Sequence, residues 1–166
     1  CSVMYTKAQH VQQHAINAIN GFSQCVNLKE GNSLSDILQM ISLAFKAEFD
    51  DDSSEKILAK INNMSDEALL AVVPQFFAQL AKEGTRNGVF AAKIIERFLF
   101  DHYHALVYPL LVLVGSQYIE CPTRNTLAIE LFEELSENNP QVANEGRIIS
   151  DGLLLCSSSL YEHWID

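Results

Sequence analysis

Glycine and proline are scarce in this sequence. Seven Gly and four Pro together make up 11 of its 166 residues. This share is about half of the roughly 12% that average globular proteins contain. Because β-sandwiches and barrels need many tight turns, for which these two residues are the main source, the shortage argues against such folds and favours helices. The sequence also shows no alternation of apolar and polar residues around a hairpin turn, which would indicate paired strands.

Basic residues, paired cysteines and long apolar runs are lacking as well. Eleven Lys and Arg stand against 21 Asp and Glu, for a net charge of −10, which repels phosphate backbones and anionic lipid surfaces. The four cysteines include no C-x-x-C pair, which is typical of proteins whose thiols stay reduced. The longest apolar run, residues 105–114, is shorter than the ~20 residues that span a bilayer. We therefore expect no nucleic-acid partner, no direct membrane insertion and a cytoplasmic location, with the nucleus as the alternative.

Helical periodicity is the main pattern that the sequence does contain. Apolar residues recur every three or four positions in most of it. The expected helices span residues 11–26, 34–49, 57–61, 66–84, 89–99, 105–114, 127–138 and 140–164. We expect a turn at residues 50–54 and a loop at residues 115–122. Pro74 must kink the fourth helix or lie in its first turn.

The order of these segments predicts an all-α fold. About eight helices joined by short links fit an α-solenoid of stacked antiparallel helix pairs, similar to HEAT or TPR repeats, or a bundle. Two Val-x-Pro motifs that end at Pro74 and Pro109, 35 residues apart, favour the repeat architecture. The residues expected to be buried between helices are Val72, Val73, Phe76, Leu80, Leu106, Tyr108, Leu110, Leu131 and Leu153.

Two groups of histidines are candidates for metal or acid–base chemistry. His10 and His14 have a spacing that can hold zinc, but no third ligand stands nearby in the sequence, so a solvated helix face is the better interpretation. His102 and His104 lie beside Asp101 and could form an acid–base cluster, although a polar helix junction is the better interpretation.

Two further groups resemble functional clusters but have simpler interpretations. Four glutamates fit a solvated helix face better than a pair of catalytic carboxylates, and five phenylalanines fit a core better than a ligand cleft. The glutamates are Glu130, Glu133, Glu134 and Glu137. The phenylalanines are Phe76, Phe77, Phe90, Phe98 and Phe100. The motifs of hydrolases, P-loop proteins, dinucleotide-binding proteins and protein kinases are absent from the sequence, so we expect no catalytic, cofactor-binding or metal-binding residues.

Three segments match, in order and separation, the pattern of a known family. Residues 32–45 read N-S-L-S-D-I-L-Q-M-I-S-L-A-F and are similar to N-x-L-x-D-x-L-x-x-x-x-L-W-F, with Ala44 in place of Trp. Residues 72–80 read V-V-P-Q-F-F-A-Q-L and are similar to V-I-P-Q-L-I-A-R-I. Residues 102–110 read H-Y-H-A-L-V-Y-P-L and are similar to H-P-Q-A-L-I-Y-P-L, with Tyr103 in place of Pro. The sequence thus resembles the FAT region of the phosphatidylinositol-3-kinase-related protein kinases, and most closely that of the target-of-rapamycin (TOR) kinases.

The resemblance continues to the end of the sequence. Residues 150–153 read S-D-G-L and residues 162–164 read E-H-W, at the spacing of the family's S-E-E-L and E-M-W. The resemblance implies that residues 1–150 form the C-terminal part of a FAT-type helical-repeat domain. It implies that residues 151–166 belong to a long last helix leading into the rapamycin-binding bundle, with Glu162 and Trp164 as interaction residues.

The resemblance also implies a function. In these kinases the FAT helices form a clamp around the catalytic domain and transmit partner binding. The chain is then expected to be a non-catalytic scaffold or regulatory segment of a large TOR-like Ser/Thr protein kinase in growth or stress signalling, and a piece of a longer polypeptide. Its partners would be the other domains and protein subunits of that kinase. ATP and magnesium would bind the parent kinase and not this segment. Two alternatives stay open: the same segment of a nonsense-mediated-decay kinase, and a free-standing HEAT- or TPR-like adaptor.

Overall fold

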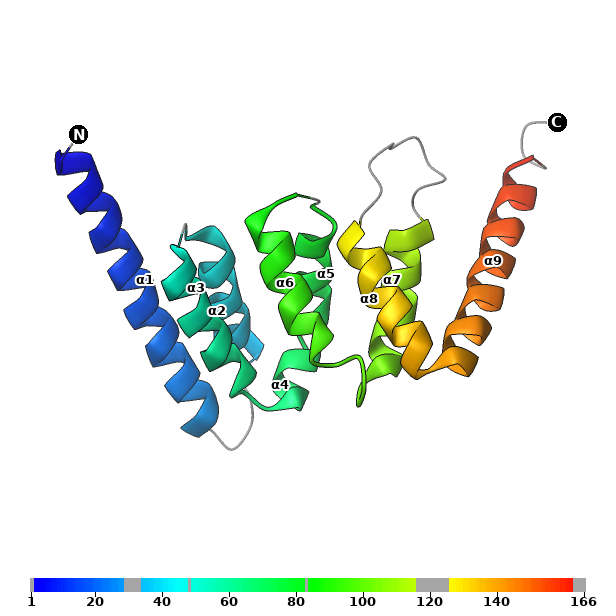
Figure 1. Cartoon of the computed structure of the whole chain (residues 1–166), viewed down its shortest axis with the longest axis horizontal. Coiled ribbons are helices and arrows are strands. Elements are labelled where there is room, and N and C mark those ends of the chain that lie inside the picture. The colour runs from blue at the N-terminus through cyan, green and yellow to red at the C-terminus, as the bar shows by residue number, and fades with distance from the viewer. Residues whose placement is uncertain (1, 29–33, 48, 83, 116–125, 163–166) are drawn as a thin grey trace. The chain divides into compact units, whose positions relative to one another are not determined.

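The structure of the chain, a computed structural model, describes residues 2–28, 34–47, 49–82, 84–115 and 126–162. These residues form nine helices and contain no β-strand, which confirms the all-α prediction (Figure 1). The helices are α1 (Ser2–Leu28), α2 (Leu34–Lys46), α3 (Asp51–Asn62), α4 (Asp66–Leu70), α5 (Val73–Leu80), α6 (Arg86–Glu96), α7 (Tyr103–Gly115), α8 (Thr126–Asn138) and α9 (Pro140–Glu162). They fall into two compact units, Cys1–Phe76 and Phe77–Asp166, whose boundary lies within α5.

The first unit is built around α1. This helix packs along α2 and α3, and α2 also contacts α4 (Figure 1). Ala15, Ile19 and Val26 are buried and lie four and seven residues apart, so they form one stripe of α1 that faces its neighbours. Because only residues 29–33 join α1 to α2, these two side-by-side helices run antiparallel, as expected for stacked helix pairs.

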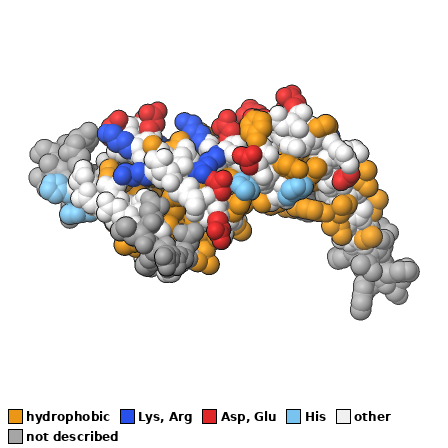
Figure 2. Space-filling view, turned by 90° about the horizontal axis from the view of Figure 1, so that it is seen from below, with side chains coloured by type: hydrophobic (Ala, Val, Ile, Leu, Met, Phe, Trp, Pro, Cys, Tyr) orange, Lys and Arg blue, Asp and Glu red, His pale blue; other side chains and the backbone are white. Residues whose placement is uncertain are grey.

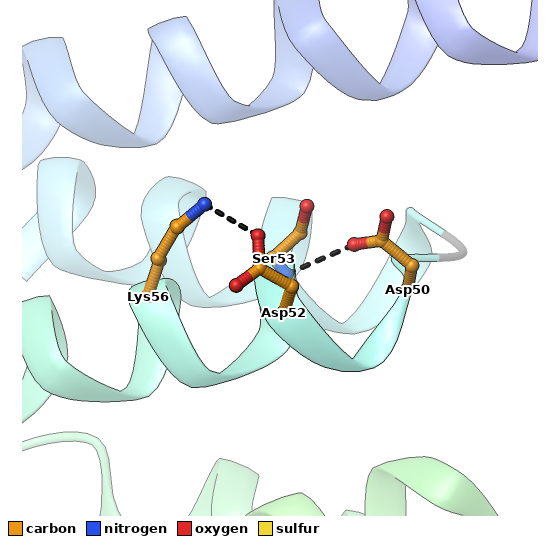
Figure 3. A network of polar contacts seen from close by, with 4 residues as sticks. All are labelled: Asp50, Asp52, Ser53 and Lys56. Carbon is orange, nitrogen blue, oxygen red and sulfur yellow. Dashed lines mark hydrogen bonds and ion pairs between the residues drawn. The ribbon is translucent and has the colours of Figure 1, made fainter.

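The acidic residues 50–52 form the beginning of α3, so the prediction of a turn at residues 50–54 is wrong. The side chain of Asp50 is the N-cap, and its Oδ1 accepts a hydrogen bond of 2.9 Å from the backbone N–H of Ser53 (Figure 3). Asp52 lies in the first turn, where the helix dipole favours negative charge. Lys56 donates a hydrogen bond to Asp52, and this bond, together with the charge of Asp52, raises the pKa of the Lys56 ammonium above its ordinary value of 10.5. Turns and N-caps favour the same residue types, so their composition alone did not separate the two structures.

The predicted fourth helix is two helices, α4 and α5, separated by a turn at residues 71–72. Ser65 caps α4, as its Oγ accepts a hydrogen bond of 3.4 Å from the N–H of Ala68. Pro74 lies in the first turn of α5, where its missing N–H removes no helical hydrogen bond. Pro109, in contrast, lies inside α7. The two Val-x-Pro motifs therefore occupy different places in their helices and do not mark a structural repeat.

The second unit contains α6 to α9. Helix α7 packs against α8 and α9, and α8 also packs against α6 and α9. Gly84 has a φ of 69° between α5 and α6, a conformation that glycine adopts without strain. Thr85 caps α6 by accepting a hydrogen bond of 3.0 Å from the N–H of Gly88. A Cβ atom on Gly88 would lie 3.1 Å from the carbonyl oxygen of Lys82, so the start of α6 fits closely against the end of α5.

Most of the predicted core is confirmed. The buried residues of the predicted set are Val72, Val73, Phe76, Leu80, Leu106, Leu110 and Leu131. The prediction is wrong for Tyr108 and Leu153, which are 43% and 60% exposed. Tyr108 lies on the face of α7 away from Leu106 and Leu110, and because α7 is apolar on every side, periodicity could not tell which face is covered. The predicted loop lies outside the described residues apart from Gly115, which ends α7. Apolar as α7 is, no helix in the described ranges has the length and hydropathy that a bilayer crossing requires.

Candidate interaction surface

The two residues that the resemblance marks for interaction lie at the end of α9 and beyond it. Glu162 is the last residue of the helix, and Trp164 lies outside the described residues. Their interaction role stays a prediction. The surface that the described residues offer is the part of α9 that precedes them.

The first half of α9 is packed within its unit. A Cβ atom on Gly146 would lie 2.6 Å from Cγ1 of Val107 and 3.0 Å from Cδ1 of Leu111, so α9 approaches α7 at this point more closely than any larger residue permits. The guanidinium carbon of Arg147 lies 4.9 Å from the centre of the Phe132 ring of α8, within cation–π distance. A glycine and an arginine thus fix this half of the helix against α7 and α8.

The part of α9 from residue 148 to residue 157, here called its second half, carries large apolar side chains that are exposed. Its side chains of this kind, here termed the α9 apolar surface, are Ile148, Ile149, Leu153, Leu154 and Leu155. Their exposed fractions lie between 48% and 70%. Figure 1 shows this half of α9 extending away from α7 and α8, and Figure 2 shows hydrophobic side chains gathered over the same end of the second unit. An exposed group of large apolar side chains on one element is typical of an interaction site.

Helical periodicity predicted part of this surface and missed the rest. Ile149 and Leu153 continue the face on which Gly146 meets α7, and of these two residues Leu153 was predicted to be buried. Ile148 and Leu155, seven residues apart, lie on a different face. The sequence feature that could have predicted the exposed face is the run of four consecutive apolar residues at 153–156. Four consecutive residues cannot all lie on one face of a helix. A helix that is apolar on more than one face needs cover on more than one side.

The polar clusters lie where their simpler interpretations place them. His10 and His14 are exposed on α1. Asp101 and His104 are exposed and His102 is half-buried, at the junction between the turn after α6 and the start of α7. Across the described residues, no three His, Cys, Asp or Glu side chains lie close enough together to hold a metal ion.

The glutamate and phenylalanine groups also have the simpler of their two interpretations, with one exception. On α8, Glu130, Glu133 and Glu137 are exposed and Glu134 is half-buried, which confirms the solvated face. Among the phenylalanines, Phe76, Phe77 and Phe98 are buried and Phe90 is half-buried, which confirms a core role. The core prediction is wrong for Phe100, which is 58% exposed in the turn after α6.

The segments that carry the family resemblance coincide with helices. Residues 34–45 lie in α2, residues 73–80 form α5, and residues 103–110 begin α7. The matched patterns are therefore helical in the structure, and many of their apolar side chains are buried, while Leu34 and Tyr108 are exposed.

Comparison with curated proteins finds TOR kinases along nearly the whole chain. The chain is 25% identical over 154 residues to the serine/threonine-protein kinase mTor of Drosophila melanogaster, covering 93% of the chain and 6% of that protein. It is 23% identical over 156 residues to the serine/threonine-protein kinase TOR2 of Saccharomyces cerevisiae, covering 94% of the chain and 6% of that protein. It is 24% identical over 155 residues to the serine/threonine-protein kinase tor1 of Schizosaccharomyces pombe, covering 93% of the chain and 6% of that protein.

These matches locate the similarity within a small part of each relative. The chain spans about 6% of the length of the curated relatives that it matches. No protein-family model matches the chain, and no solved structure matches it. The chain is thus similar, at low identity and over most of its length, to one region of TOR kinases.

Proposed function

We propose that this chain is a non-catalytic helical scaffold segment of a large TOR-like serine/threonine-protein kinase. In this proposal its helices form part of a clamp around the kinase domain and relay partner binding to it in growth or stress signalling. The observation that carries the proposal is the continuous similarity of 93% of the chain to a stretch that makes up 6% of a TOR kinase, found again in two yeasts. The all-helical structure supports it, because packed helix pairs move as semi-rigid units and can bias a neighbouring element.

The α9 apolar surface supports a role inside a larger assembly. Covering one large aliphatic side chain contributes about 1.5–3 kcal/mol. The five side chains of this surface are 48–70% exposed, so covering them completely would stabilise a contact with another domain by several kcal/mol before the cost of ordering. In the proposal, the other domains and protein subunits of the kinase provide this cover.

The remaining parts of the proposal come from the family resemblance. Residues 1–150 form the C-terminal part of a FAT-type domain, and residues 151–166 lead into the rapamycin-binding bundle, with Glu162 and Trp164 in contact with partners. The parent kinase uses ATP and magnesium, whereas this segment binds neither. The parent acts in the cytoplasm or the nucleus.

The test begins with the complete reading frame that contains this sequence. We expect a kinase domain downstream of residue 166, phosphate transfer to a Ser/Thr peptide by the purified parent, and none by the 166-residue chain. In the parent, Leu154→Asp should lower activity or release a subunit, while Glu137→Gln on the solvated face of α8 should do neither. A reading frame without a kinase domain would replace the proposal with a free-standing adaptor. Phosphate transfer that stays with the chain through repeated purification would also contradict it.

A further inference from the structure

Helix α9 loses its tertiary packing directly after Arg147. Ala143 and Gly146 are buried, and Arg147 lies over an aromatic ring of α8. None of residues 148–157 is buried, and a Cβ atom on Gly152 would meet nothing within 4 Å. Figure 1 shows α9 extending away from α7 and α8 in this part. From residue 148 onward, the helix therefore depends mainly on its own local interactions.

The packed half of α9 provides the nucleus for the rest of the helix. A helix that has a nucleus continues as long as adding each further residue is favourable. For good helix formers the propagation constant is about 1–1.6 per residue, so five of them gain at most about tenfold. Whether the second half stays helical is thus decided by the residues that directly follow the packed half.

These residues are weak helix formers. Residues 148–152 read I-I-S-D-G. The two Ile lose side-chain freedom in a helix, Ser and Asp compete for backbone hydrogen bonds, and Gly loses the most backbone entropy. Relative to Ala, each of the five lowers the propagation constant by about two- to fivefold, and together they lower it by about a hundredfold. This loss exceeds the tenfold gain that good helix formers would provide, so opening at this point is favoured.

The residues after 152 do little to compensate. The hydroxyl of Ser157 donates a hydrogen bond of 2.8 Å to the carbonyl oxygen of Leu154. Side-chain bonds of this kind compete with the helical backbone bonds and tend to bend a helix. The last turn of α9, which ends at Glu162, has no basic residue to complement the helix dipole.

A glycine of α1 shows that packing can hold such a residue in a helix. Gly21 lies in the interior of α1, and a Cβ atom on it would also meet nothing within 4 Å. Ile19 and Val26, however, are buried on either side of it in the sequence, so tertiary contacts hold the helix before and after the glycine. Buried neighbours of this kind are lacking around Gly152. The weak residues and the end of packing coincide only in α9.

We propose that residues 148–152 form a hinge at which α9 opens, so that its second half is helical in only a fraction of the molecules while it is uncovered. The continuous helix is the ordered state of this equilibrium. The α9 apolar surface gains contacts only when another surface covers it, so covering and ordering occur together. This device is a property of the chain itself and does not depend on the parent being a kinase.

The test is hydrogen exchange of the intact 166-residue chain, measured by mass spectrometry with fragmentation that resolves short segments. The amides of residues 153–157 should exchange within about fivefold of the rate of an unstructured peptide, because opening at the hinge exposes them. The amides of residues 144–147 should exchange at least about a hundredfold more slowly than that rate, because the packing of the unit must open first.

Variants at the hinge test its cause. Ser150→Ala, Asp151→Ala and Gly152→Ala combined should slow exchange of residues 153–157 at least about threefold, because the three substitutions raise helix propensity. Gly152→Pro should leave the exchange of residues 144–147 unchanged within about twofold, although proline breaks a helix interior. A matched control, Gly21→Ala combined with Ser23→Ala, raises the helix propensity of α1 and should leave residues 153–157 unchanged.

Four outcomes would overturn the proposal. The first is equal protection of residues 144–147 and 153–157 in the natural chain. The second is unchanged exchange of residues 153–157 in the triple alanine variant. The third is an equal slowing of that exchange in the α1 control. The fourth is a loss of protection at residues 144–147 in Gly152→Pro, which would show that the two halves of α9 open together.

Discussion

The two halves of α9 show opposite relations between composition and burial. The first half reads P-Q-V-A-N-E-G-R and has few large apolar side chains, yet Gly146 sits against Val107 and Leu111 of α7. The second half reads I-I-S-D-G-L-L-L-C-S and is far more apolar, yet Leu153 and Leu155 are 60% and 70% exposed. The difference shows that the burial of a helical segment depends on which other helices pack against it, and not on its own composition. The more apolar half has apolar surface that no described residue buries.

The largest expected difference in the free energy of unfolding is between substitution of a buried leucine and substitution of an exposed one. Leu135 of α8 is fully buried, and Leu154 of α9 is 48% exposed. Leu135→Ala should lower the free energy of unfolding by about 2–5 kcal/mol, because it leaves a cavity. Leu154→Ala should lower it by less than about 0.5 kcal/mol in the isolated chain. Urea unfolding followed by circular dichroism measures both. Equal losses would show that the second half of α9 is packed within the chain.

The sequence predicted the helices better than it predicted what covers them. Backbone hydrogen bonds of a helix are local, so periodicity located α2, α6 and α8. It left open whether Pro74 kinks a helix or lies in its first turn. The burial of a side chain depends on residues that are far away in the sequence, so the predictions that Tyr108 and Leu153 are buried were wrong. Phe100 was misplaced for the same reason. Its type favours a core, and its position in a turn after α6 leaves it exposed.

Two glycines of α9 are expected to differ in how their substitution by alanine changes the free energy of unfolding, and this difference is smaller than that between the two leucines. A Cβ atom on Gly146 would meet Val107, whose branched side chain is buried and stiff, whereas one on Gly152 would meet nothing within 4 Å. Gly146→Ala should lower the free energy of unfolding by about 1–2 kcal/mol, as overpacking exceeds the gain in helix propensity. Gly152→Ala should raise it by up to about 1 kcal/mol.

A second substitution tests the cause of the Gly146 effect. If the clash with Val107 is responsible, Gly146→Ala should cost less in a Val107→Ala background than in the natural one, with a coupling free energy of about 1 kcal/mol. Stabilisation by Gly146→Ala equal to that by Gly152→Ala would contradict the close approach of α9 to α7.

The smallest effect on stability is expected on the α9 apolar surface itself. Replacing Leu154 and Leu155 together by Ser should move the free energy of unfolding by less than about 1 kcal/mol, because both side chains are exposed. The same change should clearly reduce the fluorescence of a hydrophobic dye bound to the folded chain. Unchanged dye fluorescence would show that these residues do not form the exposed apolar surface.

The central claim is that the rest of a larger kinase covers the second half of α9, and Cys156 measures this most directly. Cys156 and Cys25 are both exposed in the isolated chain, so both should react rapidly with a thiol reagent. In the purified parent protein, mass spectrometry of the labelled peptides should show Cys156 reacting at least about tenfold more slowly than in the isolated chain, since the reagent must wait for the contact to open. The rate for each protein in denaturant serves as its reference. Equal rates for Cys156 in the parent and in the isolated chain would contradict the claim.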